Sequence, residues 1–478
     1  MKVHWKIAAA LAIAGGSGLT DVASAQTRTH RLSDAFVQVT DEPSASDLPS
    51  DLPGAPVSYK AAFSDSGEGA VCQHCQCNTC TCEPEEEEEV CEPWRLCCQK
   101  ECGWNVHGWV NGGIMANFHD PADDFNGPVT FPDRDYGQFN QGYLIAENIA
   151  DNGGCGWDFG GRVDVLLGSD YFFTQAVGLE LDDDGTAHWN QNSAGFGAEY
   201  GLALPQFYVQ AQYNDWDVKL GHFYTPIGYE VVPATGNFFY THAYTMQYGE
   251  PFTHTGALGA YKYSDTTTLN LGIVNGWDNF DRTVDTAAAI FGFAWDGGEG
   301  LTVAWNMILS PNETNINGAQ TNRDMYSFVL GRTFGDCDQW QYVFQHDYGW
   351  QLDGVRGGGA TAEWYGVNQY LFYTINDCWK AGTRFEWFRD DDGVRVTGLR
   401  NQNNFIFNDG YEGNFFEVST GLNWTPSSNL TVRPELRYDW FDGVKVADGG
   451  TGPAGGGPFR GGTGVDQIVA GFDVIYLW

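Results

Sequence analysis

The feature that most constrains this chain is a two-residue alternation of apolar and polar side chains that recurs from Trp104 to the last residue. In the run from Leu430 to Trp440 the even positions are apolar, whereas the odd ones carry Thr, Arg, Glu, Arg and Asp. Because successive side chains of a strand point to opposite faces, such a run predicts a β-strand with two unlike faces. About sixteen such runs, most of them roughly ten residues long, follow one another and predict an all-β fold.

A soluble β-sandwich also alternates, so the connections between the runs matter. They alternate between short ones, such as 150–155, 335–338 and 376–378, and long ones, such as 119–138, 169–203, 225–253 and 310–323. This sorting, with a charged polar face and aromatics near strand ends, predicts a closed antiparallel transmembrane β-barrel of about 16 strands, with short periplasmic turns and long extracellular loops. Closure requires the first and last strands to pair. Segment 169–203 leaves room for a further pair of strands.

The charge of the chain limits the classes of partner that it can bind. The formal net charge is −38, and nucleic acid is excluded because its binding needs a basic surface. Aromatic residues make up 15% of the chain, which suits strands with aromatic belts. Beyond the N-terminus no stretch has 18 consecutive apolar residues, so the sequence predicts no transmembrane helix.

The N-terminal part divides into three segments before the barrel. Residues 1–25 read as a secretory signal peptide, with a basic start, an apolar stretch and a small-residue cleavage site. Residues 26–70 are rich in Ser, Asp and Pro and predict a flexible linker. Residues 71–103 form a Cys-rich acidic segment, which we expect in the periplasm, and residues 104–478 form the barrel in the bacterial outer membrane.

Twelve cysteines are candidates for disulfides or metal ligation. Nine lie in the acidic segment, at Cys72, Cys75, Cys77, Cys80, Cys82, Cys91, Cys97, Cys98 and Cys102, and three lie in predicted short turns, at Cys155, Cys337 and Cys378. The first five have metal-like spacing, but an oxidising compartment favours disulfides. Disulfides, a metal–thiolate cluster and cross-links between chains all remain open, and the identity of any metal is unknown.

Three stretches carry a resemblance to a known family. They are LGHFYTPIGYEVVPATGNFFYTHAY (220–244), EPFTHTGALGAY (250–261) and NLGIVNGWDN (270–279). Together with the strand layout they resemble the β-barrel porin-2 family over roughly residues 104–478. The resemblance implies a porin-type outer-membrane protein, and it supplies no solute and no binding residues.

Charged residues on the polar parity are candidate pore-lining residues, because the charges and width of a pore set its selectivity. They are Asp158, Arg162, Asp164, Lys219, Arg384, Glu386, Arg433, Glu435, Arg437 and Asp439. Opposed acidic and basic rows would create a transverse field suited to small polar solutes. The alternative is that these charges only pair across strands.

The connection 225–253 is a candidate constriction loop. It contains Glu230, His242 and several aromatic residues that have little reason to lie in a solvent loop. We therefore expect part of it to fold into the lumen. At the other end of the barrel sequence, Phe472, Tyr476 and Trp478 form an aromatic row that resembles the signal read by the barrel-assembly machinery.

The functional prediction is a porin whose water-filled channel passes small polar solutes or ions, with a preference for cations. The alternative is a structural surface barrel with a plugged lumen, cross-linked through its Cys-rich segment. No nucleophile elbow or zinc-protease helix motif occurs, so we predict no enzyme activity and no cofactor. The expected partners are outer-membrane lipids, the assembly machinery and further copies of the chain in a homo-oligomer such as a trimer.

Overall fold

The computed structural model describes the barrel region and little of what precedes it. The described residues are 96, 103–121, 126–129, 137–182, 187–190, 200–281, 287–396, 400–401, 404–405, 409–447, 456–460 and 462–478. The predicted signal peptide and linker, and the nine cysteines of the acidic segment, lie outside them. Among the described residues no helix is long and apolar enough to cross a membrane.

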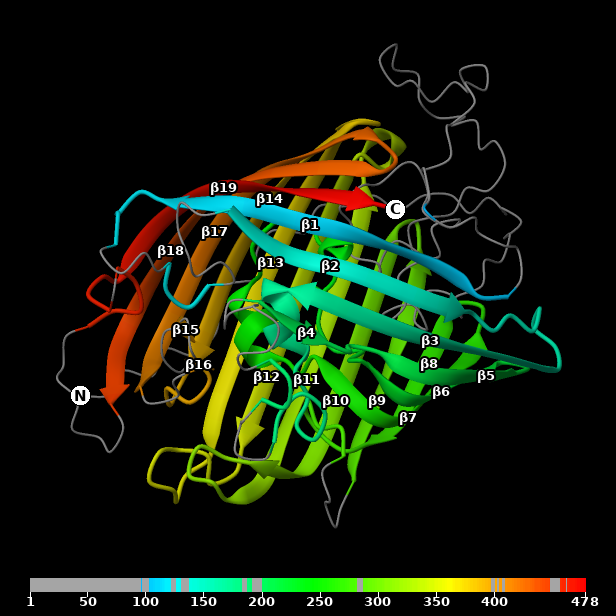
Figure 1. Ribbon diagram of the computed structural model, residues 1–478, viewed down its shortest axis with the longest axis horizontal. Helices are drawn as coiled ribbons and strands as arrows, with labels where there is room; N and C mark the ends of the chain where they lie inside the picture. Colours follow the sequence, from blue (N-terminus) through cyan, green and yellow to red (C-terminus); the bar gives the residue numbers. More distant parts are fainter. Residues whose placement is uncertain are drawn as a thin grey trace, which may run out of the picture. The chain divides into compact units, whose positions relative to one another are not determined.

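Sixteen long strands form one antiparallel sheet that closes on itself (Figure 1). In ring order they are β1 (Asn105–Asn117), β2 (Gly137–Asn148), β3 (Trp157–Gly168), β5 (Phe207–Tyr213), β6 (Trp216–Tyr224), β7 (Thr253–Ser264), β8 (Thr267–Val274), β9 (Ala288–Gly298), β10 (Leu301–Thr314), β11 (Gln320–Phe334), β12 (Trp340–Gln351), β13 (Ala362–Asn376), β14 (Trp379–Asp390), β17 (Asp409–Ser427), β18 (Leu430–Ala447) and β19 (Asp466–Leu477). The predicted closed barrel of about 16 strands is confirmed.

The barrel closes through the pairing of its first and last strands. β1 and β19 run antiparallel, from Trp109 opposite Leu477 to Asn117 opposite Val469. Because every strand then has two neighbours, no edge with unpaired backbone groups is left in the ring. Figure 1 shows β19 and β1 lying side by side.

The two faces of the wall are inverted relative to a soluble protein. On β18 the side chains of Arg437 and Asp439 are 1% and 0% exposed, whereas the neighbouring Leu436 and Tyr438 are 46% and 38% exposed. An apolar outer surface around a polar interior is the arrangement of a barrel that faces lipid. The strand faces predicted from the alternation are therefore those of the structure.

The connections also sort by length. Those between β5 and β6 and between β7 and β8 have two residues each, 214–215 and 265–266, whereas 225–252 joins β6 to β7 at the opposite end. We call these the short-turn end and the long-loop end. The predicted long connection at 310–323 is instead short, 315–319, because β10 continues through a bulge to Thr314 and pairs with an equally extended β11.

Short elements lie in the connections between the strands of the ring. β4 (Gly201–Ala203) pairs with the end of β3, and it is the one strand that the described part of 169–203 contains. η1 (Ser169–Thr174) follows β3, η2 (Ala234–Gly236) and η3 (Thr245–Gly249) lie between β6 and β7, η4 (Asp336–Asp338) lies in a short turn, and β15 (Arg400–Asn401) pairs with β16 (Asn404–Phe405).

Candidate functional site

The connection between β6 and β7, residues 225–252, lies inside the barrel and is called the inner segment here. None of its residues is exposed, although it contains only two one-turn helices. It is bonded to inward-facing side chains on separate parts of the wall. Asn306 on β10 donates to the Pro226 carbonyl at 2.8 Å, and Gln141 on β2 donates to the Val232 carbonyl at 2.7 Å. The segment therefore crosses the interior between these strands.

Arg384 on β14 bonds both to the inner segment and to a neighbouring strand of the wall. Its Nη1 donates to Glu230 Oε1 at 2.6 Å and to the Thr241 carbonyl at 2.8 Å. Its Nε donates to Glu417 on the adjacent strand β17. Glu230 also contacts His242 Nδ1, at 3.2 Å. The two sequence-predicted residues of the inner segment are thus brought together, and Arg384 fastens them to the wall.

Two arginines of β18 hold the carbonyl groups of the inner segment. Arg433 Nη1 donates to the carbonyls of Ala234 and Asn237, at 2.8 and 2.6 Å. Arg437 Nη1 donates to the His242 carbonyl at 2.6 Å. A buried carbonyl without a hydrogen-bond partner is costly. These side chains therefore supply the hydrogen bonds that a helix or sheet would otherwise provide.

Acidic side chains of the same wall hold the N–H and hydroxyl groups. Glu435 accepts from the amide and the hydroxyl of Thr241, at 2.9 and 2.6 Å. Glu386 accepts from the Tyr244 amide at 2.6 Å, and Asp439 accepts from the Tyr244 hydroxyl at 2.7 Å. The acidic and basic residues of β14 and β18 therefore match the donors and acceptors of one irregular backbone.

Arg162 and Asp164, two of the predicted residues of β3, form a separate group. Arg162 Nε donates to Asp164 Oδ1 at 2.7 Å, and its Nη1 donates to Glu147 of β2 at 3.1 Å. Asp164 also accepts from the Tyr143 hydroxyl at 2.7 Å. These charges are buried and pair both within β3 and with the neighbouring strand β2.

Two further predicted residues have other surroundings. Asp158 lies near the short-turn end, where its carboxylate accepts from the Asp151 amide at 2.7 Å. Lys219 on β6 is buried, with its Nζ 4.9 Å from the centre of the Tyr208 ring. The ten predicted residues therefore do not form one cluster.

Sequence reasoning missed some of the acidic partners of the arginines. Glu417 faces inward beside Arg384, and Asp473 on β19 accepts from Arg433 Nε at 2.9 Å. Both lie on the polar parity of their strands, so a systematic listing of that parity would have included them. Strand register, which places Asp473 directly opposite Arg433, was the missing information.

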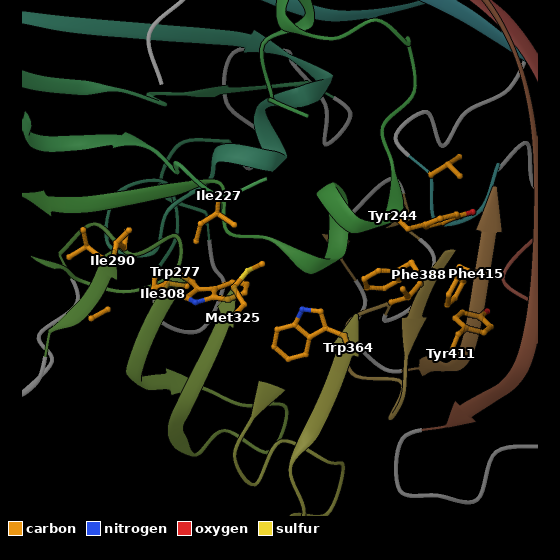
Figure 2. Close-up of a cluster of buried hydrophobic side chains, with 14 of the residues drawn as sticks. Ile227, Tyr244, Trp277, Ile290, Ile308, Met325, Trp364, Phe388, Tyr411 and Phe415 are labelled. Carbon is orange, nitrogen blue, oxygen red and sulfur yellow. The ribbon is translucent and has the colours of Figure 1, made fainter. Parts of the chain in front are cut away.

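Apolar side chains also fill part of the interior. Figure 2 shows Tyr244 of the inner segment near Phe388 and Phe415 of the wall, and Ile227 of the same segment near Trp277 and Met325. The rings of Tyr244 and Phe415 are 5.2 Å apart, and Trp364 Nε1 donates to the Gly249 carbonyl at 3.0 Å. These contacts fix the path of the segment as it returns toward β7.

The remaining predicted residues lie on the outside and at the short turns. Phe472 and Tyr476 are exposed on the outer face of β19, and Trp478 is half-buried. Cys155, Cys337 and Cys378 are all exposed in short-turn-end connections. Within the described ranges no group of three or more His, Cys, Asp or Glu side chains could hold a metal ion.

The sequence matches the model of one protein family, described as "Putative beta-barrel porin-2, OmpL-like", over residues 103–477. This range covers every strand of the barrel. No curated protein matches the chain.

Solved structures are similar to this chain at low sequence identity, and the first of them shares its fold. An anion-selective porin from Comamonas acidovorans is 13% identical with a TM-score of 0.53, and the match covers 79% of this chain and 100% of that one. OmpT of Vibrio cholerae, an outer membrane protein in a trimer form, is 12% identical with a TM-score of 0.49, covering 79% and 99%. The outer membrane channel DcaP of Acinetobacter baumannii is 14% identical with a TM-score of 0.47, covering 79% and 97%.

Proposed function

The chain belongs to the putative beta-barrel porin-2, OmpL-like family, and from this we propose that it forms a water-filled channel for the passive diffusion of small polar solutes or ions. The observation that carries the proposal is the polar interior of a closed 16-strand barrel, narrowed by a segment bonded to the wall. Sixteen strands enclose enough space for an aqueous channel, whereas eight would be filled by side chains. The inner segment then sets the width of the passage.

The ten charged residues divide into two roles in this proposal. Those of β14 and β18 hold the inner segment in place, because their charged groups bond to its backbone and side chains. Those of β3 and β6 lie on the other part of the wall, and Asp158, the half-buried one among them, is the candidate for contact with the solute. Glu230 and His242 belong to the constriction.

We propose a preference for cations because the chain has 62 acidic residues against 24 lysines and arginines. A surplus of one charge at a channel concentrates counter-ions there. The anion-selective porin of Comamonas acidovorans shares only the fold, so its selectivity is not transferred. The reversal potential across a planar bilayer in a KCl gradient measures the preference, and a potential of anionic sign would contradict it.

Deletion of residues 231–247 tests the constriction. Removal of this stretch takes away the contacts to Arg433, Glu435 and Arg437, and single-channel conductance should rise. Deletion of 357–359, three glycines in the connection between β12 and β13, is the matched control that should leave conductance unchanged. Equal conductance of the wild-type protein and the 231–247 deletion would refute the role of the inner segment.

A structural barrel with a plugged lumen is the second candidate, and the absence of any exposed residue between 225 and 252 favours it. Absence of conductance in the wild-type protein, with current appearing on deletion of 231–247, would support it. In either case we propose an outer-membrane location with the segment before β1 in the periplasm, insertion by the barrel-assembly machinery, and assembly as a homo-oligomer such as a trimer.

A further inference from the structure

One guanidinium packs against two tryptophan rings where the inner segment returns to the wall. Arg395 lies in the connection that follows β14, and its Cζ is 4.8 Å from the ring centre of Trp364 and 5.4 Å from that of Trp277. Figure 2 shows the two rings side by side, with their centres 6.1 Å apart. Trp364 is on β13 and Trp277 follows β8, so the guanidinium joins parts of the wall that are separated by four strands of the ring.

The backbone that carries Arg395 is fixed as well. The Asp390 carboxylate accepts from three successive backbone amides, those of residues 394–396, at 3.0, 2.7 and 2.8 Å. The Nε of Arg395 donates to the Tyr248 carbonyl of the inner segment at 2.6 Å. The position of the guanidinium is therefore set before any ligand arrives, and little side-chain freedom is left to lose on binding.

The outer edge of this guanidinium is open. Among the described residues Arg395 forms no ion pair, and its side chain makes one hydrogen bond, the one through Nε. Nη1 and Nη2 are thus left without a partner, and neither belongs to the fully buried polar atoms of the barrel. Arg395 as a whole is half-buried, so the edge formed by Nη1 and Nη2 faces accessible space. An arginine held in this way is ready to bind a planar anion.

The surroundings leave the positive charge of Arg395 incompletely compensated. Burial and the charge of Arg323 lower the pKa of the Arg395 guanidinium, although Asp390 and Asp278 act in the opposite direction. Arg323, on β11, lies against the same Trp277 ring, with its Cζ 5.5 Å from the ring centre. The Asp278 carboxylate is engaged by the backbone amides of residues 252 and 253, at 2.9 and 2.8 Å. A further negative group is needed to balance this end of the interior.

We propose that Arg395 binds the carboxylate of a small organic solute at the constriction, with Nη1 and Nη2 as the two donors. The two coplanar N–H groups of this edge match the two oxygens of a carboxylate. Phosphate carries more charge and more oxygens than one guanidinium edge can satisfy. The inference rests on the proposed channel for the passage of the solute, but binding itself can be measured in a barrel that does not conduct. The preference for cations concerns the ion current and is measured separately.

Binding is measured without transport by ¹⁹F NMR of 4-fluorobenzoate added to the folded protein in detergent. The wild-type protein should broaden the signal, and Arg395→Gln should weaken the affinity about tenfold, because a charge-assisted pair of hydrogen bonds is lost. Arg389→Gln is the matched control, since it removes an arginine of β14 that is already paired with Asp391, and it should bind as the wild-type protein does. The uncharged 4-fluorobenzamide should respond equally to the wild-type protein and Arg395→Gln.

Equal affinity of 4-fluorobenzoate for the wild-type protein and Arg395→Gln would overturn the proposal. If Arg395→Gln fails to fold, Arg395→Lys takes its place. An ammonium keeps the charge but not the planar fork, so this variant should also lose affinity.

Single-channel recording tests whether the bound solute lies in the passage. 4-Fluorobenzoate should interrupt the KCl current of the wild-type protein, and the interruptions should be about tenfold shorter in Arg395→Gln. Interruptions of unchanged length would contradict the role of Arg395 in solute binding. A wild-type protein without any current would refute the channel, whereas the NMR comparison would still decide the site.

Discussion

Gly108 and Trp478 exchange two backbone hydrogen bonds, from Trp478 N to the Gly108 carbonyl at 2.9 Å and from Gly108 N to the Trp478 carbonyl at 3.2 Å. They extend the β1–β19 ladder to the last residue of the sequence. The indole of Trp478 also lies against Gly108, since a Cβ atom on Gly108 would be 2.7 Å from Trp478 Cζ2. Barrel closure at the short-turn end therefore depends on the absence of a side chain at position 108.

Gly108→Ala should weaken this closure. The added Cβ would lie 2.0 Å from the Tyr143 carbonyl oxygen, a backbone atom that cannot move aside freely. Overpacking of this kind costs about 1–3 kcal/mol. Gly137→Ala on β2 is the matched control, because its Cβ meets nothing within 4 Å. Urea unfolding in lipid vesicles should separate the two variants, and equal midpoints would contradict the proposed clash.

Trp478→Asp should impair assembly more than stability. The change places a charge in the outer aromatic row, where Phe472 and Tyr476 are exposed. At the edge of the membrane an acidic residue costs about 1 kcal/mol or less, so the folded barrel should survive. The folded fraction recovered from cell envelopes should nevertheless fall. Trp478→Phe, which keeps an aromatic ring, should assemble normally, and normal assembly of Trp478→Asp would show that the row is not an assembly signal.

Arg384→Met should destabilise the barrel because it removes the cation between Glu230 and Glu417. Breaking a buried ion pair on one side costs about 3–5 kcal/mol. Addition of Glu230→Gln to this variant should recover part of the loss, since it removes one of the stranded charges. Arg332→Met, on a half-buried position of β11, should change the free energy of unfolding by only about 0.5 kcal/mol. Additive effects of Arg384→Met and Glu230→Gln would contradict the contact.

The long connection after β3 should loosen as the pH rises through neutrality. Burial raises the pKa of Glu180 to about 7, although the amides of Leu204 and Ala176 donate to its carboxylate and oppose the shift. Since the pKa is higher in the folded state, the stabilising contribution is complete below about pH 4.5 and is lost as the pH passes 7. The resulting change in the free energy of unfolding is on the order of 3 kcal/mol.

Glu180→Gln provides the comparison for this prediction, because its amide carries no titratable proton in that range. The unfolding free energy of the wild-type protein, minus that of Glu180→Gln, should fall as the pH rises from 5 to 8. A constant difference across these pH values would exclude Glu180 as the titrating group.

The orientation of side chains could be predicted from sequence because it depends only on neighbouring residues. The alternation through Arg437, Tyr438 and Asp439 fixes which of them share a face, whichever strands lie alongside. The structure confirms those faces on β18. The bonds of the inner segment could not be predicted in this way, since Arg384 and Glu230 are 154 positions apart and meet only across the closed ring.

The strand ends were predictable only where the pattern ended with turn residues. The two-residue turn at Asn214 and Asp215 follows such a pattern, and Asn214 has a positive φ of 50° that this residue type tolerates. In contrast, the polar residues from Ser310 to Thr314 read as a loop, but they continue β10 beyond a bulge. Polar sequence cannot distinguish a solvent loop from a strand extended beyond the apolar zone.

The inner segment begins and ends on adjacent, paired strands, with Tyr224 opposite Thr253 and the Thr225 amide bonded to the Phe252 carbonyl at 2.9 Å. Its replacement would leave the wall ladder unbroken at that point. The contents of the barrel can therefore diverge within one continuous stretch of the gene, while the strands that form the wall stay the same. For protein engineering, the inner segment can be exchanged as one unit. This exchange is the simplest way to give the barrel a passage of different width.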